Sequence, residues 1–396
     1  MSLKTQIQSL AQGIYEEVIE MRRHIHSNPE LSFKEEKTAK YVYDRLDSWG
    51  IKTQTNIAGH GLLGFIHGQQ SGENKVIALR ADMDALPITE ESNRPYKSQN
   101  EGVMHACGHD VHTSSLLGTA RILSQLSAHF SGTIKLIFQP AEERLPGGAS
   151  LMIKEGILKA PEVSAILGQH VQPFLDTGKI GIRSGMYMAS ADEIYMRVIG
   201  KGGHAAHPAS FIDPVAITAQ IIISLQQVVS RSDPRIPSVL SFGKIKAEGA
   251  TNIIPEEVCL EGTFRTMDEN WRTQAHDKIT SIVQGIAEGM GAKVELDIRK
   301  GYPVLFNDEA LTQKTRSKIS DYVGEENVVD LDLWMAAEDF SYYTHEVPGC
   351  FYRLGTRNEA RGIVHGVHTS RFDIDEAAMK LSTGLMAWLA INELQN

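Results

Sequence analysis

At 396 residues the chain is longer than one hydrophobic core usually organises, so two domains are the default expectation. The formal net charge of −10, without any block of Lys or Arg, disfavours nucleic acid or an anionic membrane as the main partner. Three cysteines leave one unpaired in any disulfide scheme, which suits a reducing compartment. The N-terminal stretch lacks a secretory apolar region, and no apolar run reaches membrane-spanning length. We therefore expect a protein of the cytoplasm.

The chain begins with an amphipathic helix that ends near Asn28, and from residue 76 it alternates apolar strands with helices. Alternation of this kind is typical of an α/β fold with a mostly parallel sheet. Apolar runs rich in Val, Ile and Leu predict the strands, and apolar residues at helical spacing predict the helices. The expected strands are 76–82, 133–139 and 164–171, and the expected helices are 112–126 and 149–158.

The pattern changes near residue 190. Strand 192–202, helix 213–230, strands 238–248 and 256–266, helix 271–290 and strand 293–301 follow one another. This β-α-β-β-α-β order is the ferredoxin-like arrangement. The α/β style then resumes, so we expect a discontinuous metal-binding catalytic domain, 1–187 and 303–396, with residues 188–302 inserted as an α+β domain.

Groups able to bind metal or move protons lie at the ends of the strands of the first domain. Asp82 ends the first strand and Asp84 follows it, Glu142 and Glu143 follow the second, and His170 ends the third. Ligand sites in open α/β sheets lie at the carboxyl ends of strands, so these groups are expected to converge. Adjacent carboxylates on extended backbone point in different directions. One of the Glu142–Glu143 pair can therefore bind metal while the other holds a water for attack.

The loop 105–112 is dense in metal-capable side chains. Cys107 and His109, in a loop without helical or strand periodicity, are predicted ligands of Zn²⁺ or a similar divalent transition metal. Asp110 is more simply explained as the N-cap of the following helix. His105 and His112 are interpreted as structural or supporting groups.

Two further candidate metal ligands, His365 and His368, lie three residues apart near the C-terminus. Sequence spacing alone does not choose between them.

Together these segments resemble a known family. The motifs are RADMDALP, HACGHDVH, FQPAEE, GQHV, GKGGHAAHP, TNIIPEEVCLEGTFR, AEDFSYY and HTSRF. In this order they resemble the amidohydrolase branch of the aminoacylase and carboxypeptidase (M20) metallopeptidases. That branch includes N-acyl-amino-acid amidohydrolases, hippurate hydrolases and hydrolases of auxin–amino-acid conjugates.

The resemblance implies two divalent metal ions, zinc, manganese, nickel or cobalt. It implies that Glu142 is the general base. It also implies that Asp84 orients a metal-binding side chain without binding metal itself. This chain has Asp82 where related enzymes have a ligand histidine. His368 is preferred over His365 because it begins the family's His-x-x-x-Phe pattern. The implied metal ligands are Cys107 (as the bridging thiolate), His109, Glu143, His170 and His368.

The inserted segment resembles the family's lid and dimerisation domain, which implies a homodimer, with a tetramer as the alternative. His204 matches a histidine that stabilises the tetrahedral oxyanion, from its own subunit or the partner. Asn252 and Arg265 match positions that bind a substrate carboxylate. A turn asparagine and a strand-surface arginine are their alternative interpretations. His207 departs from the family, where that position is often apolar.

The sequence therefore predicts a metal-dependent amidohydrolase that hydrolyses N-acyl amino acids or similar small amides. A dipeptidase or exopeptidase of the same family would share every ligand. A hydrolase with Cys107 as nucleophile is a second alternative, and a non-catalytic protein with a structural metal is a third. The second leaves the Glu142–Glu143 pair unexplained, and the third leaves a spare carboxylate in a site that needs only four ligands.

Overall fold

The structure, a computed structural model, describes residues 1–395 and forms two compact units. The first unit comprises residues 1–185, 306–332 and 339–395, and the second comprises residues 186–305 and 333–338. The chain leaves the first unit within β7 (Gly185–Met188) and returns to it within β14 (Leu305–Asn307). No helix within the described residues combines the length and apolar content that a membrane span requires.

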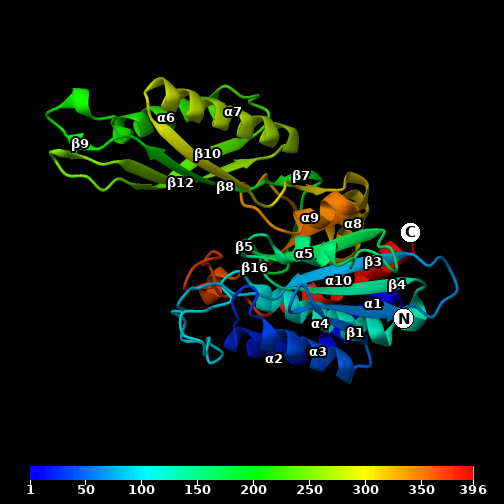
Figure 1. Cartoon of the computed structure of the whole chain (residues 1–396). Helices are drawn as coiled ribbons and strands as arrows, with labels where there is room; N and C mark the ends of the chain where they lie inside the picture. The colour runs from blue at the N-terminus through cyan, green and yellow to red at the C-terminus, as the bar shows by residue number, and fades with distance from the viewer. Residues whose placement is uncertain (396) are drawn as a thin grey trace. The chain divides into compact units, whose positions relative to one another are not determined.

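An eight-stranded sheet forms the centre of the first unit (Figure 1). Parallel pairs join β4 to β3, β3 to β5, β5 to β16 and β6 to β15, so the predicted α/β fold with a mostly parallel sheet is confirmed. In spatial order the strands are β1 (Lys52–Ile57), β2 (Gly61–His67), β4 (Thr133–Gln139), β3 (Val76–Asp82), β5 (Ala165–Asp176), β16 (Gly349–Arg357), β6 (Ile180–Ile182) and β15 (Val328–Asp330).

The helices of the first unit cover this sheet. Every residue of β3 is buried, as expected of a strand with both faces covered. Helices α4 and α10 pack against each other and against β3, and in Figure 1 α4 lies below β3 and β4 while α9 lies above them. The helices are α1 (Leu3–Gly13), α2 (Tyr15–Ser27), α3 (Glu36–Ser48), α4 (His109–Gln125), α5 (Gly148–Lys154), α8 (Glu309–Val323), α9 (Ser341–Glu346) and α10 (Ala378–Leu394).

Two features of this unit differ from the sequence prediction. The single N-terminal helix is two helices, α1 and α2, that meet at Ile14. Strands β1 and β2 form an antiparallel hairpin that the sequence did not predict. Most of β1 is exposed because it is the edge strand, so it lacks the apolar run by which the central strands were found.

The second unit contains a four-stranded antiparallel sheet in the order β10-β12-β8-β13. Helices α6 and α7 pack on it around one apolar core, and residues of β8 alternate between buried and less buried positions, so one face of the sheet meets the helices. The predicted ferredoxin-like order is confirmed. Its elements are β8 (Asp192–Ile199), α6 (Pro214–Ser230), β10 (Ser238–Lys246), β12 (Glu257–Thr266), α7 (Glu269–Gly289) and β13 (Lys293–Lys300).

A buried ionic network joins α2 to the start of α4. Asp110 is not the N-cap of α4, as the sequence suggested, because the helix begins at His109 after Gly108. Its carboxylate instead accepts a bond from Arg22 at 2.7 Å and pairs with His26 Nδ1 at 2.8 Å. His26 Nε2 lies 3.4 Å from Glu90. Burial lowers the pKa of His26, but the charge of Asp110 and the bonds to Asp110 and Glu90 outweigh it and raise this pKa above its usual value.

This network gives the first prediction. Because the folded-state pKa of His26 is raised, its stabilisation is complete below its unfolded pKa and is lost as pH rises through the folded value. We expect His26→Gln to lower the free energy of unfolding by about 1.5–3 kcal/mol at about pH 5.5, measured by urea unfolding, and by less at about pH 9.

His24→Gln, on the same helix, is the control. Burial lowers the pKa of His24, so its substitution should have the opposite pH trend. If His26→Gln lowered the free energy of unfolding equally at both pH values, His26 would not be positively charged in this network.

Candidate metal centre

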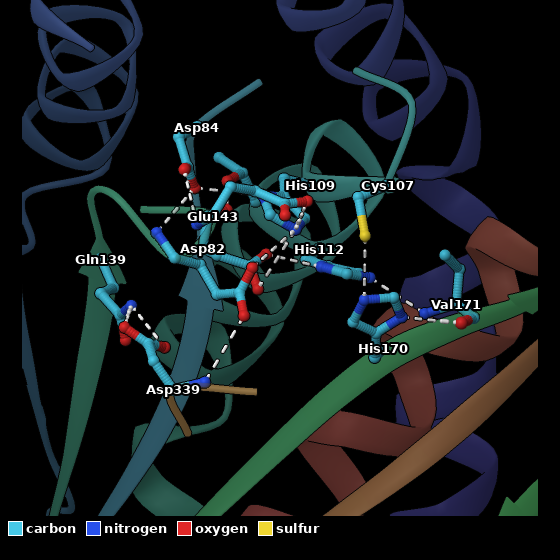
Figure 2. A network of polar contacts seen from close by, with 12 residues as sticks. Asp82, Asp84, Cys107, His109, His112, Gln139, Glu143, His170, Val171 and Asp339 are labelled. Atoms are coloured by element: carbon cyan, nitrogen blue, oxygen red, sulfur yellow. Dashed lines mark hydrogen bonds and ion pairs between the residues drawn. The ribbon is translucent and has the colours of Figure 1, made fainter. Parts of the chain in front are cut away.

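Six side chains from four segments of the chain converge near the carboxyl ends of β3 and β4, and Figure 2 labels Cys107, His109, Glu143 and His170 among them. His170 does not end its strand, as the sequence suggested, because β5 continues to Asp176. The loop before α4 supplies Cys107, and the first residue of α4 is His109. The segment after β4 supplies Glu142 and Glu143, and β5 carries His170. His368 comes from the loop that precedes α10. The structure thus brings together all of the predicted ligands and the predicted base.

Their ligand atoms form overlapping groups whose members lie within 4.8 Å of one another: Cys107–His109–His170, Cys107–Glu143–His368 and His109–Glu142–Glu143. Cys107 Sγ lies 3.4 Å from His170 Nε2, and His368 Nε2 lies 3.2 Å from Glu143 Oε1. The thiol belongs to the first two groups, which is the position a ligand shared by two ions would occupy. The His109 Nε2 atom lies 3.9 Å from both Glu142 Oε2 and Glu143 Oε1.

Two observations test whether a cation fits this site. Within the described residues, the buried Nε2 atom of His109 has no hydrogen-bond partner. The bonds to Cys107 and Glu143 raise the pKa of His368 to about 10, so the cluster favours positive charge strongly. A buried thiol, imidazoles and carboxylates are the donors that zinc and related transition metals take. The residues present therefore fit divalent metal ions.

Hydrogen bonds fix the orientation of the histidines. His170 Nδ1 donates to the Val171 carbonyl at 2.7 Å, which leaves Nε2 facing Cys107. His112 has both ring nitrogens engaged, since Nδ1 donates to Asp82 at 2.6 Å and Nε2 accepts the Val171 N–H at 2.9 Å. A histidine with both nitrogens bonded within the chain supports the site without binding metal, as the sequence suggested.

Of the two C-terminal histidines, the structure brings His368 to the cluster. His365 is exposed and belongs to none of the ligand groups found among residues 1–395. His368 has a left-handed backbone (φ +61°), and its N–H donates to the Ala106 carbonyl at 2.7 Å. A non-glycine residue in this region costs free energy, and such strain concentrates at functional sites. His105 is fully buried outside the ligand groups, and burial lowers its pKa to about 3.

Asp84 lies behind the cluster and is completely buried. One of its oxygens pairs with His109 Nδ1 at 3.2 Å and accepts the Glu142 N–H at 3.0 Å. The other accepts the Glu143 N–H at 3.0 Å and the Ser32 hydroxyl at 2.6 Å. Burial alone would raise the pKa of Asp84, but its bond with His109 and the other donors outweigh this and lower it. One ionised carboxylate therefore fixes a histidine and both members of the acidic pair.

The sequence did not identify Ser32 or Glu35 as part of the site. Glu35 is fully buried, and its Oε1 accepts the Ala141 N–H at 2.7 Å. Both residues precede α3, where they resemble the polar start of an ordinary amphipathic helix. No local pattern marks a residue whose partner lies about a hundred positions away.

The remaining predicted residues belong to the second unit. His204 and Asn252 are exposed on the short strand pair β9 (Gly203–His204) and β11 (Ile253–Ile254) and the turn beside it. His204 Nδ1 accepts the Ala206 N–H at 3.1 Å, so the neutral ring carries its hydrogen on Nε2. Arg265, on β12, is half-buried and donates to the Met335 carbonyl at 3.0 Å.

Comparison with known proteins identifies the family of this chain. Residues 78–391 match Peptidase family M20/M25/M40. The chain belongs to this family. It is 46% identical over 308 residues to an N-acyl-L-amino acid amidohydrolase of Geobacillus stearothermophilus, covering 77% of this chain and 82% of that one. It is 38% identical over 395 residues to thermostable carboxypeptidase 2 of Saccharolobus solfataricus, covering 99% of both.

Among solved structures, the YxeP protein of Bacillus subtilis, a dinuclear metal-binding peptidase of the M20 family, matches with a TM-score of 0.83 and 35% identity. The match covers 97% of this chain and 99% of that chain. The predicted family and enzyme class, a metal-dependent amidohydrolase, are confirmed.

The geometry around Asp84 gives the second prediction. Asp84→Asn keeps the side-chain volume but replaces one acceptor oxygen with an amide donor that faces backbone N–H groups. We expect the affinity of the full chain for Zn²⁺ to fall by about 10–100-fold, measured by competition with a chromogenic chelator.

Asp44→Asn, an exposed residue on α3, is the control and should bind Zn²⁺ as the wild type does. Unchanged affinity in folded Asp84→Asn protein would show that Asp84 does not position the ligands.

Proposed function

We propose that this enzyme hydrolyses the amide bond of N-acyl amino acids, releasing a carboxylic acid and an amino acid. The observation that carries the proposal is the acidic pair. Glu143 joins a metal-binding group with Cys107 and His368, and the neighbouring Glu142 carboxylate lies beside the same centre. The amidohydrolase from Geobacillus supports the substrate class.

We propose Cys107, His109, Glu143, His170 and His368 as the ligands of two divalent metal ions, with Cys107 shared between them. Such ions, when bound, would polarise the amide carbonyl and lower the pKa of water towards neutrality. The mixture of thiol, imidazole and carboxylate suits zinc, manganese, nickel or cobalt.

Glu142 is proposed as the general base. It takes a proton from water as the water oxygen bonds to the amide carbon, and it returns a proton to the nitrogen as the C–N bond breaks. The Asp339 N–H lies 3.4 Å from Glu142 Oε1, and Asp84 holds the Glu142 backbone. Both contacts limit the positions that the carboxylate can take.

Residues 188–302 are proposed as the lid and dimerisation domain of a homodimeric, cytoplasmic enzyme, joined to a catalytic domain of residues 1–187 and 303–396. The His204 tautomer supports its proposed role, because an Nε2–H group can donate to a developing oxyanion. A cytoplasmic location suits a centre in which Cys107 must stay reduced, and all three cysteines are free thiols in the structure.

Two alternatives are weaker. A nucleophilic cysteine needs a lowered pKa, whereas burial and the charge of Glu143 raise the pKa of Cys107. A structural metal site closes with four ligands and has no use for the carboxylate of Glu142. A peptidase specificity keeps the same chemistry, and the Saccharolobus carboxypeptidase favours it as the second candidate.

The function is tested on Glu142. Glu142→Gln keeps the shape of the side chain and removes its basicity, so we expect metal content to be unchanged and kcat for an N-acetyl amino acid to fall by about 10²–10⁴-fold. Amine release is the measurement, over a panel of N-acetyl amino acids and dipeptides.

A chelator should abolish wild-type turnover, and Zn²⁺ or Mn²⁺ should restore it. If the enzyme preferred dipeptides, it would be a peptidase. If Glu142→Gln kept full activity, Glu142 would not be the general base.

Arg265 is proposed, with Asn252, to bind the substrate carboxylate. Burial lowers the pKa of its guanidinium, and among the described residues no carboxylate forms an ion pair with it. A half-buried cation of this kind favours an anionic ligand.

We expect Arg265→Met to raise KM for an N-acetyl amino acid by about 10–100-fold, since a charge-assisted bond contributes about 1.5–3 kcal/mol. With the amidated substrate, which lacks the carboxylate, the variant and the wild type should have equal KM. Arg197→Met, an exposed arginine of the same unit, is the control. Equal KM increases on both substrates would argue against carboxylate binding.

A further inference from the structure

The backbone of the acidic pair is held by two buried carboxylates. Three consecutive N–H groups, those of Ala141, Glu142 and Glu143, donate to carboxylate oxygens at 2.7, 3.0 and 3.0 Å. Asp84 accepts the last two bonds, and Glu35 accepts the first. Glu35 stands outside every ligand group found among residues 1–395 and is not assigned a role by the reaction proposed above.

Ala141 is the point at which this segment turns. Its backbone is left-handed (φ +53°), a conformation that costs an L-residue free energy. Both of its backbone polar groups are fixed, because the N–H donates to Glu35 and the carbonyl accepts the Gly148 N–H at 2.9 Å. A Cβ atom at Gly148 would lie 1.8 Å from the Pro140 oxygen, so this turn tolerates no bulk beside it. The direction of Glu142 is thus set one residue earlier.

Glu35 itself sits in a costly position. It is fully buried, and its Oε2 atom has no hydrogen-bond partner within the described residues. Burial, followed by the nearby charge of Asp84, raises the pKa of Glu35 to about 7. An apolar residue would avoid this cost but would leave the Ala141 N–H without its acceptor. The need for an acceptor for the Ala141 N–H therefore explains why a carboxyl group, and not an apolar side chain, occupies position 35.

We propose that Glu35 is a positioning residue of the hydrolytic centre, which holds Ala141 in its left-handed conformation and so places the Glu142 carboxylate for proton transfer. The proposal rests on the proposed role of Glu142 as the base. Ser32, three residues earlier, donates to Asp84, so one segment before α3 supports both carboxylates that hold the acidic pair.

The test compares substitutions at Glu35 in the full chain. Glu35→Ala removes the acceptor and Glu35→Gln retains an oxygen that can accept the Ala141 N–H. Glu35→Asp keeps the charge but draws the carboxylate back by one methylene, so it tests the contact even if the alanine variant fails to fold. Glu30→Gln is the matched control, because Glu30 lies in the same segment but accepts the N–H groups of Lys37 and Thr38 at the start of α3.

We expect Glu35→Ala and Glu35→Asp to lower kcat by about 10–100-fold while KM and Zn²⁺ affinity stay near wild-type values. Glu35→Gln should recover most of the wild-type kcat, and Glu30→Gln should change only the unfolding temperature. Crystal structures should show Ala141 leaving the left-handed region in the alanine and aspartate variants and staying there in Glu35→Gln.

Crystal structures of the Glu35 variants test the positioning role independently of the proposed function. Wild-type protein that releases no amine from any acylated amino acid would refute the function, while a displaced Ala141 would still support the positioning role. Variants in which Ala141 and Glu142 do not move, or in which kcat equals that of the wild type, would overturn it. A fall in Zn²⁺ affinity matching the fall in kcat would also overturn it, because Glu35 would then act on the ligand Glu143.

Discussion

The centre depends on hydrogen bonds from four donors to one buried carboxylate, Asp84. A single side chain fixes the ring of His109 and the backbone of both Glu142 and Glu143, and it receives the Ser32 hydroxyl from a segment before α3. These donors come from three segments that are distant in the chain. Because they share one acceptor, a shift in any of them changes the others, and the site behaves as one unit.

The same arrangement concentrates acidic groups where water is excluded. Asp82 and Asp84 are fully buried, and Glu142 is nearly so. Arg80 compensates Asp82 with a bond of 2.6 Å, and His112 donates to the other oxygen of Asp82. In the Cys107–Glu143–His368 group, the bonds to Cys107 and Glu143 raise the pKa of His368 and so favour its positively charged form. A group that favours positive charge in this way is suited to metal ions, which supply it.

Backbone strain marks the two places where chain segments enter the centre. Ala141 and His368 both have left-handed conformations, and hydrogen bonds to Glu35 and to the Ala106 carbonyl hold them. In each case the strained residue lies at or directly before a side chain that faces the cluster. The surrounding fold supplies the free energy that keeps these conformations.

The sequence determined much of this protein by itself. Apolar periodicity predicted strands β3, β4 and β5, the helix α4 and the β-α-β-β-α-β order of the second unit, because buried elements must repeat their apolar residues at fixed spacing. The strand ends and the loop 105–112 identified the candidate ligands, since metal-binding side chains are few and their clustering is visible in the chain. The edge strand β1 was missed because an exposed strand carries no such repeat.

Tertiary structure alone decided which groups meet. It brought to the cluster His368, which spacing in the sequence did not separate from His365, and it made Asp110 the partner of Arg22 and His26 where the sequence suggested a helix cap. It also brought Glu35 to Ala141, a contact that spans 106 positions. Spacing in a sequence describes neighbours along one element. Contacts between distant segments depend instead on how the strands are ordered in the sheet and on where each loop returns, and no local pattern records either.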